Sequence, residues 1–563
     1  MSLPLLATGF LALLALAYSA YGGWVARQLG LDDGRPTPAQ MRSDGVDFVP
    51  TKPFYLFGQH FSAIAAAGPI AGPILACQAF GWLPCLLWIG FGVVFIGAVH
   101  DFSALAASVR HDATSVAEIA RRYLGARAGL AVMAFIWLAL VYVIIAFTDI
   151  TAASFVSGTE EVRASARTFH PGGAVAAASV LYLLLAVTMG AAQRFLKPPL
   201  WLTTAVFVPA TFAAAWAGTW LSHRFVLDHR AWALLILAYC VVASIVPVQY
   251  LLQPRGYLGG FVLYTALAVG VIGIFFGGYT IAQPAFRTWN TGTTTGTLFP
   301  FLFVTIACGA CSGFHGLVCS GTTSKQIARE SHCRPVGYGA MLAEAFVALI
   351  ALVTVIVASS SDLAGLGPGT IYGNGIGRFL TILVGEDNLA FAVTFGAMAF
   401  STFVFDTLDV ATRLGRYLGQ ELFGWSGRLG ALAATLAIVA IPAYVALFAP
   451  PGSWASFWTL FGASNQLLAA LTLVSMTVWL HRTGRRWLFA ALPAAFVLGI
   501  TVWALGLLVA GQASASSGFD VSAVNAASAC ALLGLAGFVV AAGVQTLREG
   551  GPAHGGRKLA DSR

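Results

Sequence analysis

The chain has 563 residues, of which 58% are apolar and only 9% are charged, and its mean hydropathy is +0.82. Soluble globular domains carry about 25% charged residues, so the composition excludes a soluble protein and predicts a polytopic membrane protein. The net charge of +8 does not indicate nucleic-acid binding, because basic residues in a membrane protein mainly record its orientation. Eight cysteines in so long a chain are too few for a disulfide scaffold.

Apolar windows of about 20 residues, which cross a bilayer as a helix, predict about fifteen transmembrane spans. The three longest loops between them, 22–56, 277–298 and 360–386, show no sustained helical period and are expected to be connections. The predicted spans cover residues 3–21, 57–77, 82–105, 128–150, 173–192, 199–221, 231–252, 256–276, 299–321, 340–359, 387–405, 426–448, 455–480, 487–511 and 523–547.

The basic residues fall mostly on one side when alternate loops are assigned to alternate sides of the membrane. Of the 30 Lys and Arg residues, 24 lie on one side, and the six on the other are Arg163, Arg167, Arg224, Arg230, Arg287 and Arg378. Because loops rich in Lys and Arg stay in the cytoplasm, this asymmetry predicts an external N-terminus and a cytoplasmic C-terminus. The tail 549–563 is predicted to be disordered.

Residues 57–77 cannot form one straight helix, although they are apolar enough to cross the membrane. Gly68-Pro69 and Gly72-Pro73 stand in this span, and each proline lacks an N–H and clashes with the carbonyl group four residues earlier. The two glycines precede prolines and are therefore expected to leave helical angles. Unwound backbone at membrane depth is tolerated where it is buried in protein or lines a cavity, so the stretch is either a ligand site or a kinked packing helix.

A second break is predicted in the span 231–252, where Pro247 should deprive the carbonyl group of Ala243 of its helical partner. This span is the fifth after 57–77. Some transporters repeat at that offset in inverted topology and pair two broken helices at the midplane. We therefore expect the Ser244–Pro247 region to face the Gly68–Pro73 stretch across a substrate site.

His315 lies in the span 299–321, where an ionisable ring is costly. It is predicted either to contact substrate or a coupling proton, or to be a core histidine with satisfied hydrogen bonds. After it, Thr322 and Thr323 follow Gly321, which could end the helix; their hydroxyl groups either face an ion or form an ordinary cap.

Three cysteines share one helical face with His315 and invite a metal-site interpretation. On an unbroken helix Cys308 and Cys319 would be about 16 Å apart, whereas two thiolates on one zinc ion lie within about 4 Å of each other. A metal would need a broken helix or ligands from elsewhere, such as His60 or His100, so packing of small residues around Cys311 is favoured.

Acidic residues follow two other apolar runs. Asp409 and Arg413 are four residues apart and are expected to pair at a cytoplasmic helix end. Asp406 is either part of that surface or a buried gate or proton carrier, and Asp101 poses the same question at the end of another span. Asn465, in the span 455–480, is expected either to bond between helices or to contact substrate.

Long motifs within residues 45–475 resemble the carbon starvation protein A family. The motifs are DGVDFVPTKPFYLFGQHFSAIAAAGPIAGPILACQ, GAVHDFSALAASVRHDATSVAEIARRYLG, ACSGFHGLVCSGTTSKQIARE, TLDVATRLGRY and FWTLFGASNQLLAAL. The resemblance implies an all-α secondary transporter of the amino acid, polyamine and organocation superfamily, with a leucine-transporter-like inverted repeat and discontinuous helices. Family members are associated with peptide uptake and, in one branch, with proton-coupled import of pyruvate.

The resemblance and the residues together predict an importer of the bacterial inner (cytoplasmic) membrane, not an enzyme, that takes up a small carboxylate such as pyruvate, or short peptides, with protons. No cofactor, metal or nucleic acid is expected. The expected divisions are an N-terminal anchor and cytoplasmic loop (1–56), a transport core (57–421), additional C-terminal helices (422–548) and the tail (549–563). The alternatives are a membrane metal or redox protein, using Cys308, Cys311 and His315, and a channel or nutrient sensor.

The candidate residues form two groups. Substrate contacts are expected from Gly68, Pro69, Gly72, Pro73, Gln78, Ser244, Pro247, Ser312 and Asn465. Proton coupling or gating is expected from His60, Asp101, His315, Thr322, Thr323, Asp406, Asp409 and Arg413.

Overall fold

The computed structural model describes residues 2–44, 47–156, 162–164, 167–293, 295–450, 452–511 and 521–549. The tail predicted to be disordered lies outside these residues, except for Glu549. The regular structure of the described residues is helical apart from one antiparallel hairpin, in which β1 (Val162–Ala164) pairs with β2 (Arg167–Phe169).

The first half of the chain forms thirteen α-helices with short π- and 3₁₀-helical segments (η) between them. They are α1 (Leu3–Leu16), η1 (Ala17–Gly22), α2 (Gly23–Leu29), α3 (Pro38–Met41), α4 (Pro53–Ile64), α5 (Gly68–Phe80), α6 (Trp82–Gly92), η2 (Val93–Gly97), α7 (Ala98–Arg110), α8 (Val116–Leu124), α9 (Ala126–Val156), α10 (Pro171–Phe195), α11 (Leu200–Leu221), η3 (Ser222–Arg224), α12 (His229–Ile245), η4 (Val248–Tyr250) and α13 (Leu252–Phe276).

The second half of the described chain begins with two short helices, α14 and α15. The segments are α14 (Leu298–Thr305), α15 (Gly313–Val318), η5 (Cys319–Thr323), η6 (Ser324–Gln326), η7 (Glu330–His332), η8 (Arg334–Gly339), α16 (Ala340–Ile356), α17 (Ser360–Leu363), α18 (Pro368–Val384), η9 (Glu386–Asn388), α19 (Leu389–Phe423), α20 (Gly427–Phe448), α21 (Trp454–Arg482), α22 (Leu488–Ala510) and α23 (Val521–Arg548).

Twelve helices of the described chain are long and apolar enough to cross a membrane, or thirteen if the bent pair of α4 and α5 is one span. The predicted count of fifteen is not confirmed. Two predicted spans, 231–252 and 299–321, are not among the thirteen. The first corresponds to α12, which has only 17 residues, and the second is split into the short helices α14 and α15. The protein is therefore a multi-pass helical membrane protein.

The expectation that residues 360–386 are only a connection is wrong, because they contain α18. Its sequence is rich in glycine, which weakens an apolar period, but Gly373 and Gly377 let the helix approach Ala397 and Val393 of α19 closely. The loop 22–56 likewise contains α2, α3 and the start of α4.

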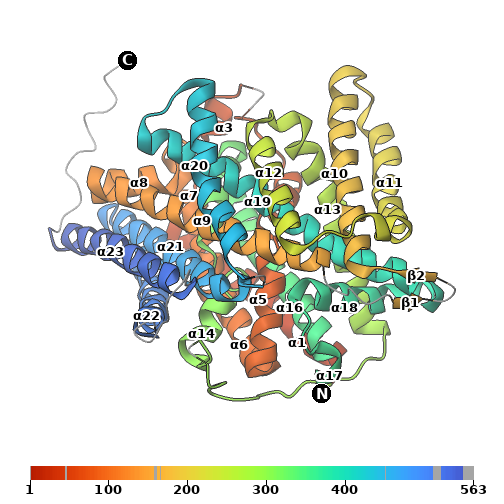
Figure 1. Cartoon of the computed structure of the whole chain (residues 1–563). Helices are drawn as coiled ribbons and strands as arrows, with labels where there is room; N and C mark the ends of the chain where they lie inside the picture. Colours follow the sequence, from red (N-terminus) through yellow and green to blue (C-terminus); the bar gives the residue numbers. More distant parts are fainter. Residues whose placement is uncertain are drawn as a thin grey trace.

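The long helices α9, α19 and α21 carry most of the packing. α9 packs against α19, α21, α12 and α20, and α19 packs against α18, α10 and α20. In Figure 1, the pair α10 and α11 lies at one end of the molecule, and α21, α22 and α23 lie together at the other. The segments α5, α14 and α16 lie between these ends.

The first break lies just before the stretch that the prolines predict. α4 ends at Ile64 and α5 begins at Gly68, and the two helices are bent by 48°. Pro69 stands in the first turn of α5, where a missing N–H costs nothing. Gly72-Pro73 does not interrupt α5, so the prediction that Gly68 and Gly72 leave helical angles is wrong.

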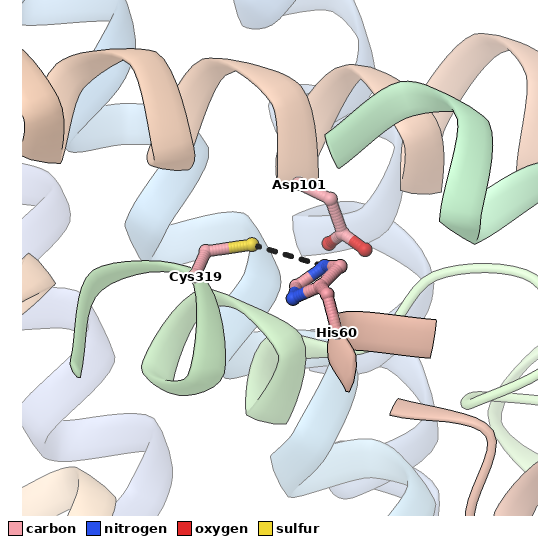
Figure 2. Close-up of side chains that lie close together, drawn as sticks. All are labelled: His60, Asp101 and Cys319. Carbon is pink, nitrogen blue, oxygen red and sulfur yellow. Dashed lines mark hydrogen bonds between the residues drawn. The ribbon is translucent and has the colours of Figure 1, made fainter. Parts of the chain in front are cut away.

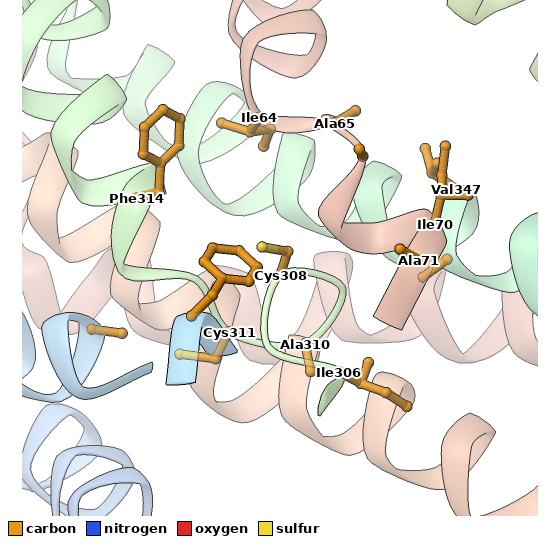
Figure 3. Close-up of a cluster of buried hydrophobic side chains, with 14 of the residues drawn as sticks. Ile64, Ala65, Ile70, Ala71, Ile306, Cys308, Ala310, Cys311, Phe314 and Val347 are labelled. Carbon is orange, nitrogen blue, oxygen red and sulfur yellow. The ribbon is translucent and has the colours of Figure 1, made fainter. Parts of the chain in front are cut away.

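The second break at membrane depth separates α14 from α15 at residues 306–312. Unwinding of this span was not predicted. α5 packs against α14 and α16, so the two breaks face each other, as Figure 3 shows for Ile64 and Ala65 on one side and Cys308 and Ala310 on the other.

The expected pairing with the Ser244–Pro247 region is a misassignment. α12 ends at Ile245 and packs against α9, α19 and α20. Pro247 is exposed in the turn that leads to α13. The proline therefore ends a helix at a connection, since it cannot continue one, and does not unwind a span at the midplane.

Candidate transport site

The two breaks touch at glycines of α5. A Cβ atom added to Gly68 would lie 2.4 Å from the Cys308 Sγ, and one added to Gly72 would lie 2.6 Å from the Thr305 carbonyl oxygen. Real Cβ atoms do not approach backbone this closely. The first break is therefore held against the second by the absence of side chains at these two positions.

Side chains of neighbouring helices satisfy the carbonyl groups at the end of α14. Trp458 Nε1 donates to the Thr305 oxygen at 3.2 Å, Trp88 Nε1 donates to the Ile306 oxygen at 3.2 Å, and Gln466 Nε2 donates to the Phe303 oxygen at 2.9 Å. A helix end leaves its last carbonyl groups without partners, so these three donors stabilise the break within the bundle.

Asn465 of α21 holds the start of α15. Its Oδ1 accepts a hydrogen bond from the Phe314 amide at 2.9 Å, and its Nδ2 lies 3.1 Å from the Ser312 Oγ and 3.2 Å from the Cys308 Sγ. Asn465 and Ser312 thus bond to each other between α21 and the segment that leads into α15. Gln466, on the same helix, holds the end of α14, so adjacent residues of α21 fix both sides of the break.

A buried cluster of carboxylate and imidazole groups lies directly behind this break. His315 Nδ1 lies 2.9 Å from Asp101 Oδ2, and His100 Nδ1 lies 2.7 Å from Asp101 Oδ1. On its other side, His315 Nε2 lies 3.3 Å from Glu344 Oε2. All four residues are buried. His315 therefore stands between two carboxylates, contributed by α7 and α16.

His60 of α4 extends the cluster toward the first break. Its Nδ1 lies 2.8 Å from the Thr323 Oγ1 and its Nε2 lies 3.8 Å from the Cys319 Sγ. Figure 2 shows His60, Asp101 and Cys319 converging from three segments, and their ligand atoms lie within 4.8 Å of one another.

His60, Asp101 and Cys319 have side chains of the kinds that bind metal ions. Of the cysteines that share a helical face with His315 in the sequence, only Cys319 belongs to this group. Cys308 and Cys311 lie in the unwound residues 306–312 and do not join the group of His60, Asp101 and Cys319. Both oxygens of Asp101 already accept ring N–H groups from His100 and His315. We therefore assign no metal ligands here and treat the group as part of the carboxylate and imidazole cluster.

Three π-helical segments border this cluster. η2 precedes His100, η5 contains Cys319 and Thr323, and η8 runs into the helix of Glu344. Single π-helical turns are rare and occur frequently at functional sites. Helical continuation through η5 to Gln326 also shows that Gly321 does not end the helix.

A second charged cluster surrounds Arg255 of α13. Its guanidinium group forms an ion pair with Asp406, lies 3.1 Å from Asp409 Oδ2 and lies 3.3 Å from the Tyr239 hydroxyl. Tyr239 also donates to Asp409 at 2.8 Å, and Tyr182 donates to the Arg255 carbonyl oxygen at 2.6 Å. Two carboxylates thus share one buried arginine.

The prediction of a cytoplasmic pair between Asp409 and Arg413 is wrong. α19 runs for 35 residues, so both lie well inside it, and Arg413 instead donates to the carbonyl oxygens of Ala243 at 2.6 Å and Val246 at 2.7 Å. It therefore bonds the Ala243 carbonyl group, which loses its helical partner to Pro247, and a second carbonyl group at the end of α12. Asp101 is likewise inside a continuous span, from Trp82 to Arg110.

Other candidates lie away from these contacts. Ser244 bonds to Thr435 of α20 at 3.2 Å, and Thr322 is exposed and bonds back to the Val318 carbonyl oxygen at 3.2 Å. Gln78 stands ten residues after Gly68 on α5, which is about 15 Å along a helix. Pro73 is buried inside α5.

The sequence arguments missed Glu344, Arg255 and Tyr239. Glu344 is the one charged residue of α16, and an acid in so apolar a span is a signal of function. Arg255 was counted among the cytoplasmic basic residues because it follows the apolar window 231–252. Tyr239 offers no sequence signal, since aromatic residues are common in spans.

The model of the family described as carbon starvation protein CstA matches residues 2–366 and 356–504. The chain belongs to this family. The peptide transporter CstA of Helicobacter pylori is 33% identical over 87% of this chain and 79% of its own, and that of Escherichia coli is 32% identical over 87% and 78%. The pyruvate/proton symporter BtsT of Escherichia coli is 30% identical over 87% and 80%.

Among solved structures, a Na⁺-coupled sialic acid symporter aligns with 98% of this chain and 98% of its own at 12% identity, with a TM-score of 0.44. The chain is assigned to the CstA family by its sequence, through the family model and the relatives above.

Proposed function

We propose that this CstA-family protein is a secondary transporter that imports a small carboxylate such as pyruvate, or short peptides, together with protons. Its relatives named peptide transporter CstA and pyruvate/proton symporter BtsT support these two substrate classes. Both classes carry a carboxylate group. The protein acts in the inner membrane, with an external N-terminus and a cytoplasmic C-terminus.

The observation that carries the proposal is the position of His315. It lies in α15, which follows the unwound residues 306–312, and it touches Asp101. Cys308 of those unwound residues meets the first break at Gly68. Ionisable groups inside a membrane bundle mark ion and substrate pathways, and broken helices mark substrate sites in secondary transporters. A proton on the His315 and Asp101 pair can therefore influence backbone that contacts the substrate.

Alternating access requires the contacts between the breaks to open. In the structure Gly68 and Cys308 are in contact and leave no room for a substrate between them. We propose that separation of α5 from residues 306–312 exposes backbone groups to the substrate carboxylate, in a core with a leucine-transporter-like inverted repeat. Asp406 and Asp409, which share Arg255, are the second candidate group for a coupling proton.

Uptake into proteoliposomes tests the proposal. Labelled pyruvate and a labelled tripeptide are each added with and without an inward proton gradient, and protein-free vesicles serve as the control. Accumulation of either compound that depends on the gradient is the expected result. A channel or a sensor would show no accumulation above the external concentration, which would contradict coupled transport.

A further inference from the structure

We infer that Glu344 binds the transported proton and exchanges it with His315. This inference rests on the proposed proton-coupled transport and names a residue of the same site. Glu344 is not among the residues expected from the sequence.

Glu344 is a buried carboxyl group without hydrogen bonds. It has an exposed fraction of 0%, and apart from the ion-pair contact of Oε2 with His315, neither carboxyl oxygen has a hydrogen-bond partner among the described residues. An isolated carboxylate in such a setting is strongly disfavoured. The side chain is therefore either protonated or paired with a cation.

His315 is the group that can exchange this proton. Its Nδ1 faces Asp101 Oδ2 at 2.9 Å, so that nitrogen carries a hydrogen, and its Nε2 faces Glu344 Oε2 at 3.3 Å. One proton between Nε2 and Oε2 gives either an imidazolium and carboxylate pair or a neutral imidazole beside a carboxylic acid. Both arrangements are acceptable in a buried site.

Loss of that proton leaves an arrangement that the closed structure cannot stabilise. A neutral His315 would then present a lone pair to a buried carboxylate, while Asp101 already carries a negative charge. The other titratable groups near Glu344 are the thiols of Cys308 and Cys311, which cannot supply a compensating positive charge. Release of the proton therefore favours separation of α15 from α16 and entry of water.

Movement of α16 away from α15 would affect both breaks. α16 packs against α4 and α5, which flank the first break, and it lies near the unwound residues 306–312 of the second. Val347, one turn from Glu344, belongs with Ile70 of α5 to the apolar cluster of Figure 3, and α16 packs against α5. Ala348 is the nearest neighbour of Gly309, at 3.0 Å from a Cβ added there. The protonation state of Glu344 is thus linked through packed side chains to the contact between the two breaks.

The test compares Glu344→Gln with the wild-type protein in proteoliposomes, with labelled pyruvate and a labelled tripeptide as probes. At an inward gradient of one pH unit, one proton per substrate supports about tenfold accumulation, and the wild-type protein should approach it for at least one probe. Glutamine resembles protonated glutamate, so the variant should still exchange labelled for unlabelled substrate. It should bring that substrate only to equal concentrations on the two sides.

Thr354→Val on the same helix is the matched control, since Thr354 is also buried and bonds only within α16. This control should accumulate substrate like the wild-type protein. Accumulation by Glu344→Gln equal to that of wild type would overturn the inference while leaving proton-coupled transport intact. No accumulation of either probe by the wild-type protein would overturn the proposed function itself, and the inference with it.

Glu344→Asp provides a second variant if the glutamine variant does not fold, as judged by size-exclusion chromatography. Aspartate keeps the proton-binding group but moves it away from His315 by one methylene. Slower gradient-driven uptake with a shifted pH profile is expected. An unchanged rate and an unchanged pH profile would count against a direct exchange between the two side chains.

Discussion

Gly72 illustrates how one missing side chain places two distant segments in contact. Its proline neighbour suggests an unwound backbone, yet α5 is helical there, and the glycine instead allows the Thr305 carbonyl oxygen to approach. Substitution therefore acts on the packing of the two breaks.

Gly72→Ala should reduce stability and abolish substrate uptake. The new Cβ atom meets rigid backbone at 2.6 Å, and overpacking of this kind costs about 1–3 kcal/mol. The measurements are thermal unfolding in detergent and uptake in proteoliposomes. Gly499→Ala is the control, because no atom lies within 4 Å of a Cβ at that position of α22. Wild-type stability and uptake in Gly72→Ala would contradict the packing role.

At the scale of elements, the ends of broken helices are satisfied by side chains from other helices. Trp88, Trp458 and Gln466 serve the end of α14, and Arg413 of α19 serves the end of α12. Proline chemistry predicts which carbonyl groups lose partners, as at Ala243. It does not predict the donor, which comes from a helix far along the chain.

Arg413→Ala should destabilise the protein by removing the donor to two carbonyl groups. Each buried carbonyl group left without a partner costs about 1–3 kcal/mol. Arg428→Ala, at an exposed position of α20, should change stability by no more than about 0.5 kcal/mol. Thermal unfolding of the two purified variants gives the comparison. Equal stability would show that water replaces the guanidinium group at the end of α12.

At the scale of the whole molecule, the orientation in the membrane is a prediction from the asymmetry of the basic residues. Arg255 no longer counts as a loop charge, because it is buried in α13 beside Asp406 and Asp409. In the alternation of loops predicted from the sequence, most of the remaining Lys and Arg residues are on the side of the C-terminus. The N-terminus is therefore expected outside the cell.

Cysteine labelling tests this orientation. Cys530 is the one exposed cysteine among the described residues and is first replaced by serine. In that background Ser2→Cys should react with a membrane-impermeant maleimide in intact cells, whereas Glu549→Cys should react only after permeabilisation. The reverse pattern would mean that the basic loops face outward. Reaction of both sites in intact cells would exclude termini on opposite sides.

The sequence alone determined the membrane location of the chain, most of its helices, its family, and the presence of His315 within an apolar span. These properties are local, because apolar length and the cost of a buried charge can be read from one segment at a time. The tertiary structure decided that Gly68 and Gly72 face residues 305–308, and that His315 stands between Asp101 and Glu344. Such pairings depend on how helices far apart in the chain pack together, and no local pattern specifies them.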